Sequence, residues 1–341
     1  MRVVHVVCSA AFAGVERYVA NLAQGQVGAG AEVVVIGGDP QQMGPAVIEA
    51  GGQWHAGDSI PAALRQLSAI APPDLVNTHM SDADLAGYLY RHRYRRRRVA
   101  QISTRHFAAP RGSGWAARKL LGLMARGIDA DLAISQFVAA SIEQSARVVY
   151  SGVPDRELSK TRDPSVLMVQ RLEAEKDTAT GIRAWAASNA WAQGWRLCIA
   201  GDGAERASLE RLATGLGVAD SVEFLGYRSD VDALLAGAGV LLATTPREGL
   251  GIAVLEAMSH GTPVIASAGG GHVETVGSVA PELLFAPGSA EAAAASLEAL
   301  IADPVRREQV GVALWEVQRS RFTLAVQVEQ TLALYREVIS R

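Results

Sequence analysis

The chain has 341 residues, of which 49% are hydrophobic and 20% are charged, and this is enough apolar material for the cores of two ordinary domains. The net charge is −3, and we expect no nucleic-acid partner. The two cysteines, Cys8 and Cys198, lie in apolar strand-like runs, which disfavours a disulfide or a cysteine metal site. No stretch approaches the ~20 apolar residues that span a bilayer, so we expect a cytoplasmic protein.

The first residues of the chain, 1–14, could be mistaken for a signal peptide, because a basic residue precedes an apolar run and a small-residue segment. His5 interrupts that run. The segment is better interpreted as a buried strand followed by a glycine-containing loop and a helix. That order is typical of the start of a nucleotide-binding βαβ unit.

Strand-like and helix-like segments alternate along the chain, which predicts parallel sheets wrapped by helices. In the first half the expected strands are 3–7, 32–36, 74–78, 99–104, 131–134 and 147–150. A polar linker is expected at 155–164, and a second series of strands at 166–169, 196–200, 221–225, 239–243 and 263–266. Helices are expected to start at 303–304 and 322–323.

This pattern predicts an α/β protein with two Rossmann-like domains that face each other across a cleft. We expect an N-terminal domain at 1–155, a C-terminal domain at 156–320, and a helix at 321–341 that packs back on the N-terminal domain. Ligands of open parallel sheets bind beyond the carboxyl ends of the strands. The polar residues after each strand are therefore the candidate site residues.

The most informative pattern follows the expected strand 239–243. Glu248 lies in the loop, Gly249 and Gly251 allow backbone amides to approach a ligand, and a helix begins here whose amino end favours phosphate. Glu256 falls on that helix, ~12 Å along the axis from Glu248 if all intervening residues are helical. Such a separation suits two grips on a long ligand better than acid–base pairing across one bond.

Residues 248–266 resemble the GT-B retaining glycosyltransferases of family four (glycosyl transferases group 1), whose members share a Glu, seven residues, Glu motif, then Ala-Met and a Gly-x-Pro-Val turn. The resemblance implies that Glu248 contacts the donor sugar as a catalytic residue and that Glu256 contacts the ribose. The residues between them that are implied to bind the sugar donor are Gly249, Leu250 and Gly251. Two ordinary surface glutamates are the alternative, which the glycines, the proline turn and the preceding strand disfavour.

A second match follows the first strand of the second domain. Arg171 offers a fork of hydrogen-bond donors and Lys176 a point charge, which together suit a diphosphate leaving group. Taken alone, the two would be interpreted as solvated residues, and the glutamate motif favours the phosphate role. The family usually has Gly before this Arg, whereas this chain has Gln170. We expect the larger side chain to leave less room around the loop.

Further candidates come from the resemblance. Gly14 is the one glycine kept of a Gly-Gly-x-Glu loop, and its amide is implied to face the leaving phosphate. Tyr227 and Arg228 are implied to border the base. His106 follows a strand, where the family has a histidine that reaches the sugar and the reaction centre. A lone histidine is more often structural, but this position favours a catalytic role for His106 over His79.

Two aspartate pairs, Asp82 with Asp84 and Asp129 with Asp131, look like the Asp-x-Asp motif that holds a divalent metal in another class of glycosyltransferases. The first pair is expected to cap a helix and the second to precede a buried strand. Arg171 and Lys176 can neutralise a diphosphate without a metal. We therefore expect no metal ion and no other cofactor.

Charge is unevenly distributed: residues 1–155 have a net charge of +3 and residues 156–341 of −6. The stretch 85–128 holds eleven basic residues and no acidic one, and its segment 114–126 has the pattern of an amphipathic basic helix. Three interpretations remain open. They are a solvated basic face, a patch for anionic lipid at the inner face of the plasma membrane, and a site for an anionic or lipid-linked acceptor.

The resemblance covers most of the chain and implies a metal-independent, retaining hexosyltransferase with an N-terminal acceptor domain and a C-terminal sugar-donor domain. We expect a nucleotide diphosphate sugar as donor, UDP-sugar in preference to GDP-sugar, and a glycan, lipid-linked or small-molecule acceptor. The alternatives are a nucleotide-sugar epimerase or hydrolase on the same fold and a non-catalytic binding module. A nicotinamide dehydrogenase is disfavoured because the first loop lacks the three-glycine fingerprint.

Overall fold

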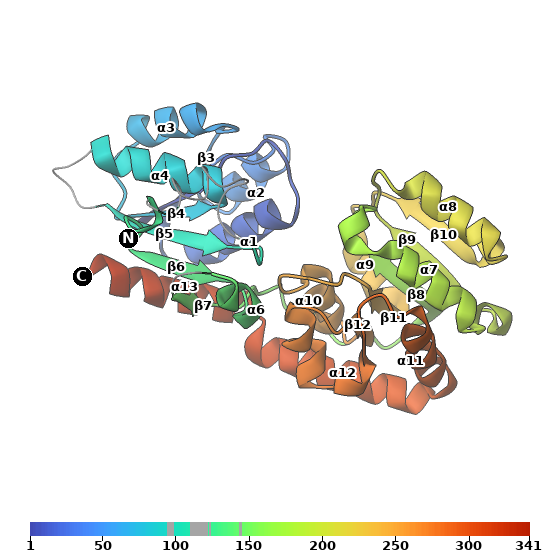
Figure 1. Ribbon diagram of the computed structural model, residues 1–341. Coiled ribbons are helices and arrows are strands. Elements are labelled where there is room, and N and C mark those ends of the chain that lie inside the picture. Colours follow the sequence, from blue (N-terminus) through green and yellow to red (C-terminus); the bar gives the residue numbers. More distant parts are fainter. Residues whose placement is uncertain (94–98, 110–121, 123, 143–144) are drawn as a thin grey trace. The chain divides into compact units, whose positions relative to one another are not determined.

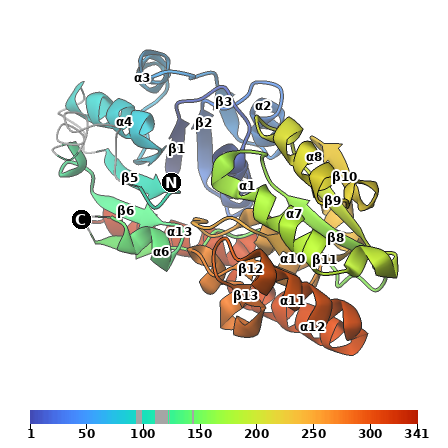
Figure 2. The same ribbon diagram turned by 45° about the vertical axis from the view of Figure 1, so that its right-hand side comes forward.

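The computed structural model describes residues 1–93, 99–109, 122, 124–142 and 145–341, and it divides into two compact units. Unit 1 comprises Met1–Gly152 with Leu324–Arg341, and unit 2 comprises Val153–Thr323. Each unit is built on one parallel β-sheet with helices packed against it (Figures 1 and 2). The predicted class, an α/β protein with two Rossmann-like domains, is confirmed.

Unit 1 contains a sheet whose described strands run in the order β3-β2-β1-β4-β5-β6-β7, all pairs being parallel. The strands are β1 (Arg2–Val7), β2 (Glu32–Ile36), β3 (Gln53–His55), β4 (Leu75–His79), β5 (Ala100–Arg105), β6 (Ala130–Ala133) and β7 (Ala146–Val148). The helices are α1 (Gly14–Gly28), α2 (Met43–Glu49), α3 (Ile60–Ala69), α4 (Ser81–Arg93), α6 (Gln136–Ala140) and α13 (Leu324–Ile339). The six strands expected in this half are present, and β3 is an addition.

The two faces of the unit 1 sheet carry different side chains, because successive residues of a strand point to opposite faces. On one face, valines and isoleucines such as Val4, Val6 and Ile36 form a buried core with residues of α3 and α4. The opposite face packs against α1 and α13 and carries the buried polar residues His5 and Asn77, together with others of the same register. At the carboxyl ends of the strands, this second face carries the histidines of the candidate site.

The C-terminal helix α13 packs on unit 1 beside α1, as Figure 1 shows in red below the sheet. A side chain at Gly25 of α1 would place its Cβ 2.5 Å from Val328 Cγ2, so this glycine permits the close approach of the two helices. Asn77 Nδ2 donates to Tyr335 Oη over 2.5 Å, and Gly152 N–H donates to Gln327 Oε1 over 2.7 Å. Burial raises the pKa of the Tyr335 hydroxyl.

Unit 2 contains a second parallel sheet, with its strands in the order β10-β9-β8-β11-β12-β13. The strands are β8 (Asp163–Val169), β9 (Arg196–Ala200), β10 (Val222–Gly226), β11 (Ala238–Ala243), β12 (Val264–Ser267) and β13 (Leu284–Phe285). The helices are α7 (Thr178–Ala187), α8 (Arg206–Gly215), α9 (Val231–Gly237), α10 (Ile252–Ser259), α11 (Ala290–Ala302) and α12 (Pro304–Arg321). Helix α7 packs beside α8 and α11, and α10 packs beside α9 and α12.

The helix starts expected in the tail are present. Asp303 caps α12, because its side chain accepts a hydrogen bond of 2.9 Å from the Arg306 amide, and Pro304 occupies the first helical position. Among the helices that the structure describes, none has the length and apolar character to cross a membrane. Residues 94–98, 110–121 and 123 lie outside the described residues, and so does most of the basic helix expected at 114–126.

Candidate active site

An ion pair joins the loops that follow two neighbouring strands of unit 2. Lys176 Nζ lies 2.8 Å from Glu248 Oε2, and the side chains are 20% and 23% exposed. The other carboxylate oxygen, Oε1, accepts a 3.1 Å hydrogen bond from the amide of Gly249. Burial raises the pKa of the Glu248 carboxyl, but the charge and hydrogen bond of Lys176 outweigh it, so the pKa stays below the ordinary glutamate value. Glu248 is therefore an ionised acceptor that is partly open to solvent.

The backbone of Lys176 is held in place by a tight turn and by two hydrogen bonds. It ends the 3₁₀ helix η1 (Ala174–Lys176), and the next residue, Asp177, has a left-handed φ of 50° and caps α7 through the amide of Thr180. The Lys176 carbonyl accepts hydrogen bonds from Thr244 Oγ1 (2.9 Å) and from Gln170 Nε2 (3.3 Å). Thr244 directly follows β11. The backbone that carries the Lys176 side chain is thus fixed to the ends of both β8 and β11.

Gln170, the departure from the family's glycine, forms part of this support. Its Nε2 also donates to Thr178 Oγ1 (2.8 Å) at the start of α7 and approaches Thr244 Oγ1 (3.3 Å). The side chain therefore lies between the strand ends and ties β8 to α7 and to the loop after β11. This cross-link is a role that the sequence did not indicate.

The backbone of Glu248 lies against the glycine-rich segment that follows β12. Its carbonyl accepts a 2.9 Å hydrogen bond from the amide of Gly271. Gly270 has a φ of +65°, and a Cβ there would lie 2.0 Å from the Glu248 carbonyl oxygen. Only glycine permits this approach without a shift of the backbone. The segment thus holds the backbone of Glu248.

His272 is a residue of this site that the sequence analysis missed. It is 1% exposed, its Nδ1 lies 3.1 Å from the Ser267 carbonyl, and a Cβ on Gly251 would lie 3.2 Å from its Nε2. Burial lowers the pKa of the imidazole, while the charge of Glu248 opposes this shift. With Nδ1 donating to the carbonyl, Nε2 of the neutral ring is an acceptor. The only signal in the sequence is a histidine directly after three glycines.

Helix α10 does not include Glu248. The separation expected in the sequence analysis assumed that all residues from Glu248 to Glu256 are helical. Gly251, with a φ of +94°, is the N-cap of α10, and the first helical residue is Ile252. Glu248 lies in the loop, so the expected separation of ~12 Å along one helix axis from Glu256 does not apply. Gly249 and Leu250 belong to the same loop, and Glu256 lies on the helix, half-buried.

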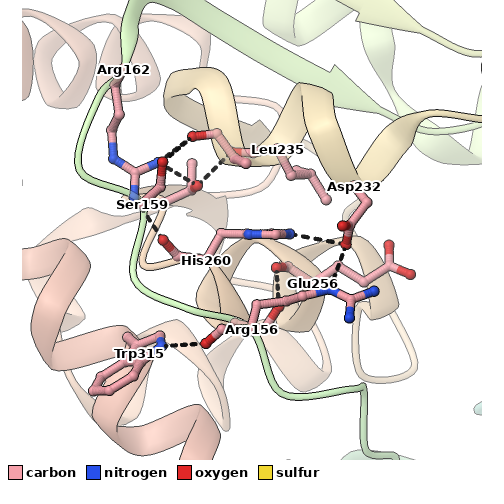
Figure 3. Close-up of polar contacts among 11 residues, drawn as sticks. Arg156, Ser159, Arg162, Asp232, Leu235, Glu256, His260 and Trp315 are labelled. Carbon is pink, nitrogen blue, oxygen red and sulfur yellow. Dashed lines mark hydrogen bonds and ion pairs between the residues drawn. The ribbon is translucent and has the colours of Figure 1, made fainter.

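A polar network holds the end of α10 that carries Glu256 (Figure 3). His260 Nε2 lies 3.0 Å from Asp232 Oδ1, and the same oxygen accepts a 2.8 Å hydrogen bond from Arg156 Nε. The Arg162 guanidinium donates to four oxygen acceptors: the carbonyls of Ala236, Ala238 and His260, and Thr262 Oγ1. Burial lowers the pKa of this guanidinium to about 10. The network fastens the segment 153–162 to α9 and α10.

The remaining donor-binding residues expected in unit 2 lie on its surface. Arg171 is 61% exposed and pairs with Glu175 over 2.5 Å. Arg228 pairs with Asp230, whose Oδ2 accepts from Arg228 Nη2 over 2.5 Å, and Tyr227 is 69% exposed. The structure therefore brings Lys176 and Glu248 into contact, whereas Arg171 and Arg228 contact carboxylates of their own loops.

Unit 1 contributes the other expected residues. Gly14 begins α1 and is exposed. Glu16, two residues later, is 3% exposed and accepts hydrogen bonds from Ser9 Oγ (2.6 Å) and from the amide of Ala13 (2.9 Å). The carboxylate thus fixes the loop that leads into α1 and, with it, the position of Gly14.

His106 lies directly after β5 and is 7% exposed. Its Nε2 is 3.0 Å from His79 Nδ1, and the Tyr18 ring packs edge-on against it with centroids 4.7 Å apart. His79, which the sequence favours less than His106 for a catalytic role, is thus its direct neighbour. Burial lowers the pKa of His106 to about 3, with a smaller effect from the charge of Arg105.

The aspartate pairs are engaged within unit 1. Asp84 is 3% exposed and accepts hydrogen bonds from Thr78 Oγ1 (2.5 Å) and Ser103 Oγ (3.0 Å). Asp129 accepts from the amide of Gln101 (2.9 Å) and pairs with Arg91. Asp82 and Asp84 lie in the first turn of α4. Asp129 directly precedes β6, and Asp131 lies on it, within the strand expected at 131–134.

The fold is that of known GT-B glycosyltransferases. The crystal structure of Anabaena HepE in complex with UDP and glucose superposes with a TM-score of 0.84 at 19% identity, covering 98% of this chain and 99% of that chain. Sucrose-phosphate synthase from Thermosynechococcus elongatus gives a TM-score of 0.78 at 20% identity, covering 100% and 99%. The protein class defined by the two parallel sheets is therefore the GT-B fold.

Sequence comparison then places the chain in a family. Residues 153–313 match the glycosyl transferases group 1 and residues 12–157 match glycosyltransferase family 4, so the chain belongs to the group 1 glycosyltransferases, as its motifs predicted. It is 33% identical over 143 residues to the 2-deoxystreptamine glucosyltransferase of Streptomyces kanamyceticus, a match that covers 41% of this chain and 37% of the relative.

A second relative is the GDP-mannose-dependent alpha-(1-6)-phosphatidylinositol dimannoside mannosyltransferase of Mycobacterium tuberculosis. It is 45% identical over 97 residues, which are 28% of this chain and 25% of that protein. The matched regions thus span only 37% and 25% of the length of these two relatives.

Proposed function

We propose that this chain is a retaining hexosyltransferase that takes its sugar from a nucleotide diphosphate sugar, without a metal ion. The observation that carries this proposal is the contact between Lys176 and Glu248 at the ends of β8 and β11. A fixed cation and a fixed carboxylate at the carboxyl ends of neighbouring parallel strands suit a ligand with both phosphate and hydroxyl groups. Lys176 is assigned to the diphosphate and Glu248 to the sugar hydroxyls.

The nucleotide of the proposed donor is UDP in preference to GDP. Support comes from the Anabaena structure with UDP and glucose, whose fold this chain shares. The mycobacterial relative is named as GDP-mannose-dependent, so the family includes both bases. Tyr227 and Arg228, after β10, are proposed to border the base, and Glu256 is proposed to bind the ribose.

The proposed reaction proceeds on one face of the sugar. The acceptor hydroxyl oxygen bonds to the anomeric carbon while the bond from that carbon to the phosphate oxygen breaks, and the hydroxyl proton moves to the departing phosphate. Catalysis then consists of positioning and of stabilising the charge on the leaving group. Lys176, Arg171 and the amide of Gly14 are proposed to supply that stabilisation. Asp84 and Asp129 already accept hydrogen bonds within unit 1, which disfavours them as metal ligands.

The acceptor is proposed to be a glycan, a lipid-linked sugar or a small molecule, bound by unit 1. We propose a cytoplasmic protein whose basic stretch 85–128 contacts anionic lipid or an anionic acceptor. Flotation with vesicles with and without acidic lipid tests the lipid version, and absence of binding at low salt would remove it.

A thermal-shift screen against UDP, GDP and their sugars tests the donor assignment, because a ligand that binds only the folded state raises its stability. We expect the largest shift with UDP or a UDP-hexose. Product analysis then separates the reaction classes: transfer requires an acceptor, an epimerase converts the donor, a hydrolase releases free sugar, and a binding module changes nothing. A new donor or an unchanged mixture in the presence of acceptors would overturn the proposal.

A further inference from the structure

Three histidines and a glutamine form one continuous chain of hydrogen bonds in unit 1. Gln26 Oε1 lies 2.8 Å from His5 Nε2, His5 Nδ1 lies 3.1 Å from His79 Nε2, and His79 Nδ1 lies 3.0 Å from His106 Nε2. The first three residues are 0% exposed and His106 is 7% exposed. We call this set the histidine relay. It connects α1 with the end of β5.

The sheet register explains how these residues meet. Strands β1, β4 and β5 are neighbours, with His5 opposite Asn77 and His79 opposite Thr104. Because side chains alternate between faces every residue, His5, His79 and His106 all lie on the face that α1 covers. Each histidine is one step nearer the carboxyl ends of the strands than the one before.

All three imidazoles are held neutral. Burial lowers the pKa of His5 to about 4, against a smaller opposing effect of Gln26, and it lowers that of His106 to about 3. For His79, burial and then the two flanking histidines lower the pKa well below its ordinary value. A neutral imidazole has one nitrogen that donates and one that accepts. The hydrogen of one ring therefore decides the tautomer of the next.

We propose that Gln26 sets the tautomer of His106 through His5 and His79, so that His106 offers an unprotonated Nδ1 to the bound sugar. The amide oxygen of Gln26 only accepts, so His5 carries its hydrogen on Nε2 and accepts on Nδ1. His79 then donates from Nε2 and accepts on Nδ1, and His106 donates from Nε2. Gln26, His5 and His79 are positioning residues. The role of the bare Nδ1 rests on the function proposed above.

The ligand chemistry of this acceptor follows from its position. In the described part of the chain, no hydrogen bond is formed by His106 Nδ1, and the edge-on Tyr18 ring restricts rotation of the imidazole. A neutral acceptor at a strand end suits a sugar hydroxyl, which can donate one hydrogen bond. It does not suit a phosphate oxygen, which also accepts. The relay thus distinguishes the sugar from the diphosphate of the ligand.

The tautomers can be observed directly in the full chain. In protein labelled with ¹⁵N at histidine, long-range ¹H–¹⁵N correlation spectra identify the protonated ring nitrogen, and single histidine-to-asparagine variants assign the signals. We expect His5, His79 and His106 all to carry the hydrogen on Nε2. In Gln26→Leu, which removes the acceptor, we expect His106 to become a mixture of tautomers. In Thr104→Val, which loses a buried hydrogen bond on the same face outside the relay, we expect no change.

A hydrogen on Nδ1 of His106 in the wild type, or an unchanged tautomer in Gln26→Leu, would overturn the proposal. A second readout is the affinity for UDP-glucose compared with that for UDP, by calorimetry. We expect Gln26→Leu to weaken UDP-glucose binding about fivefold, the equivalent of one neutral hydrogen bond, with UDP unchanged. If both ligands weaken equally, the role toward the sugar is wrong. If the wild type binds neither, the proposed function fails while the tautomer result still stands.

Discussion

Lys176 Nζ lies 2.8 Å from Glu248 Oε2, although the two residues are 72 positions apart in the sequence. The contact depends on β8 and β11 being neighbours in the sheet, since each residue follows one of these strands. Both groups keep about a fifth of their side-chain surface in solvent. A diphosphate that binds Lys176 must therefore compete with a carboxylate that is already in place.

Replacement of the lysine tests its assignment to the diphosphate. Lys176→Met removes a charge-assisted hydrogen bond, and we expect UDP affinity to fall by about 10- to 100-fold. Lys160→Met, at an exposed lysine of the same unit, is the matched control and should leave UDP affinity unchanged. Calorimetric titration with UDP measures both. Equal affinity of Lys176→Met and the wild type would refute the assignment.

Replacement of the glutamate should separate nucleotide binding from transfer. Glu248→Gln keeps the shape of the side chain but removes the negative charge that competes for Lys176. We expect UDP to bind a few-fold more tightly and sugar transfer to fall by about 100-fold, as for loss of a charged group that acts on the transition state. Steady-state transfer and UDP titration on the same preparation test this. A parallel fall of both quantities would contradict it.

The sequence predicted the strand series because most strands are buried apolar runs between turn residues. It missed β3, where Trp54 and His55 are half-buried and no apolar run stands out, and it missed β13, which has only two residues. It placed Glu248 and Lys176 separately at strand ends, but their direct contact requires the strand order. That order depends on how the sheet assembles over long sequence distances, which local patterns do not encode.

Other parts of the site were missed for a different reason. His5 was interpreted only as an interruption of an apolar run, because the partners that make it useful, Gln26 and His79, come from other elements. His272 follows a glycine-rich loop, and its burial depends on packing against Gly251. In both cases the chemistry of the side chain is decided by burial and by a long-range hydrogen bond, which the local sequence does not show.

The buried histidines should make the protein less stable in acid. In the unfolded chain, the His5 imidazole binds a proton below about pH 6.5. In the folded protein, it does so only near pH 4, because burial has lowered its pKa. The stability that His5 contributes is therefore complete above about pH 6.5. It is lost as the pH falls through this window, by about 1.4 kcal/mol per pH unit for each such histidine.

Denaturant unfolding at pH 7, 6 and 5 measures this dependence. His5→Leu should lower stability at pH 7 and should also reduce the slope of the unfolding free energy against pH. His92→Gln, at an exposed position on α4, should leave the slope as in the wild type. An unchanged slope in His5→Leu would mean that this histidine does not contribute to the acid sensitivity.

Arg162 should be a main support of unit 2. Its guanidinium donates to four oxygen acceptors on α9, β11 and the turn after α10, as Figure 3 shows in part. Arg162→Met leaves these acceptors without their donor, and we expect a loss of about 2–4 kcal/mol of unfolding free energy. Arg162→Lys should recover only part, because an ammonium cannot reproduce the planar fork. Arg306→Met, which breaks an exposed ion pair with Glu282, should cost at most about 1 kcal/mol.

Two of the three glycines expected to bind the sugar donor, Gly251 and Gly14, should respond differently to alanine. Gly251 has a φ of +94°, and a Cβ there would lie 3.1 Å from Cδ2 of His272. We expect Gly251→Ala to lower the unfolding free energy by about 1–2 kcal/mol for the left-handed backbone alone and to displace the His272 ring. Gly14 has no described atom within 4 Å of the new Cβ and begins a helix, so Gly14→Ala should be neutral or slightly stabilising. Thermal unfolding gives the stabilities, and equal losses in both variants would show that the strain at Gly251 is not what its backbone angle indicates.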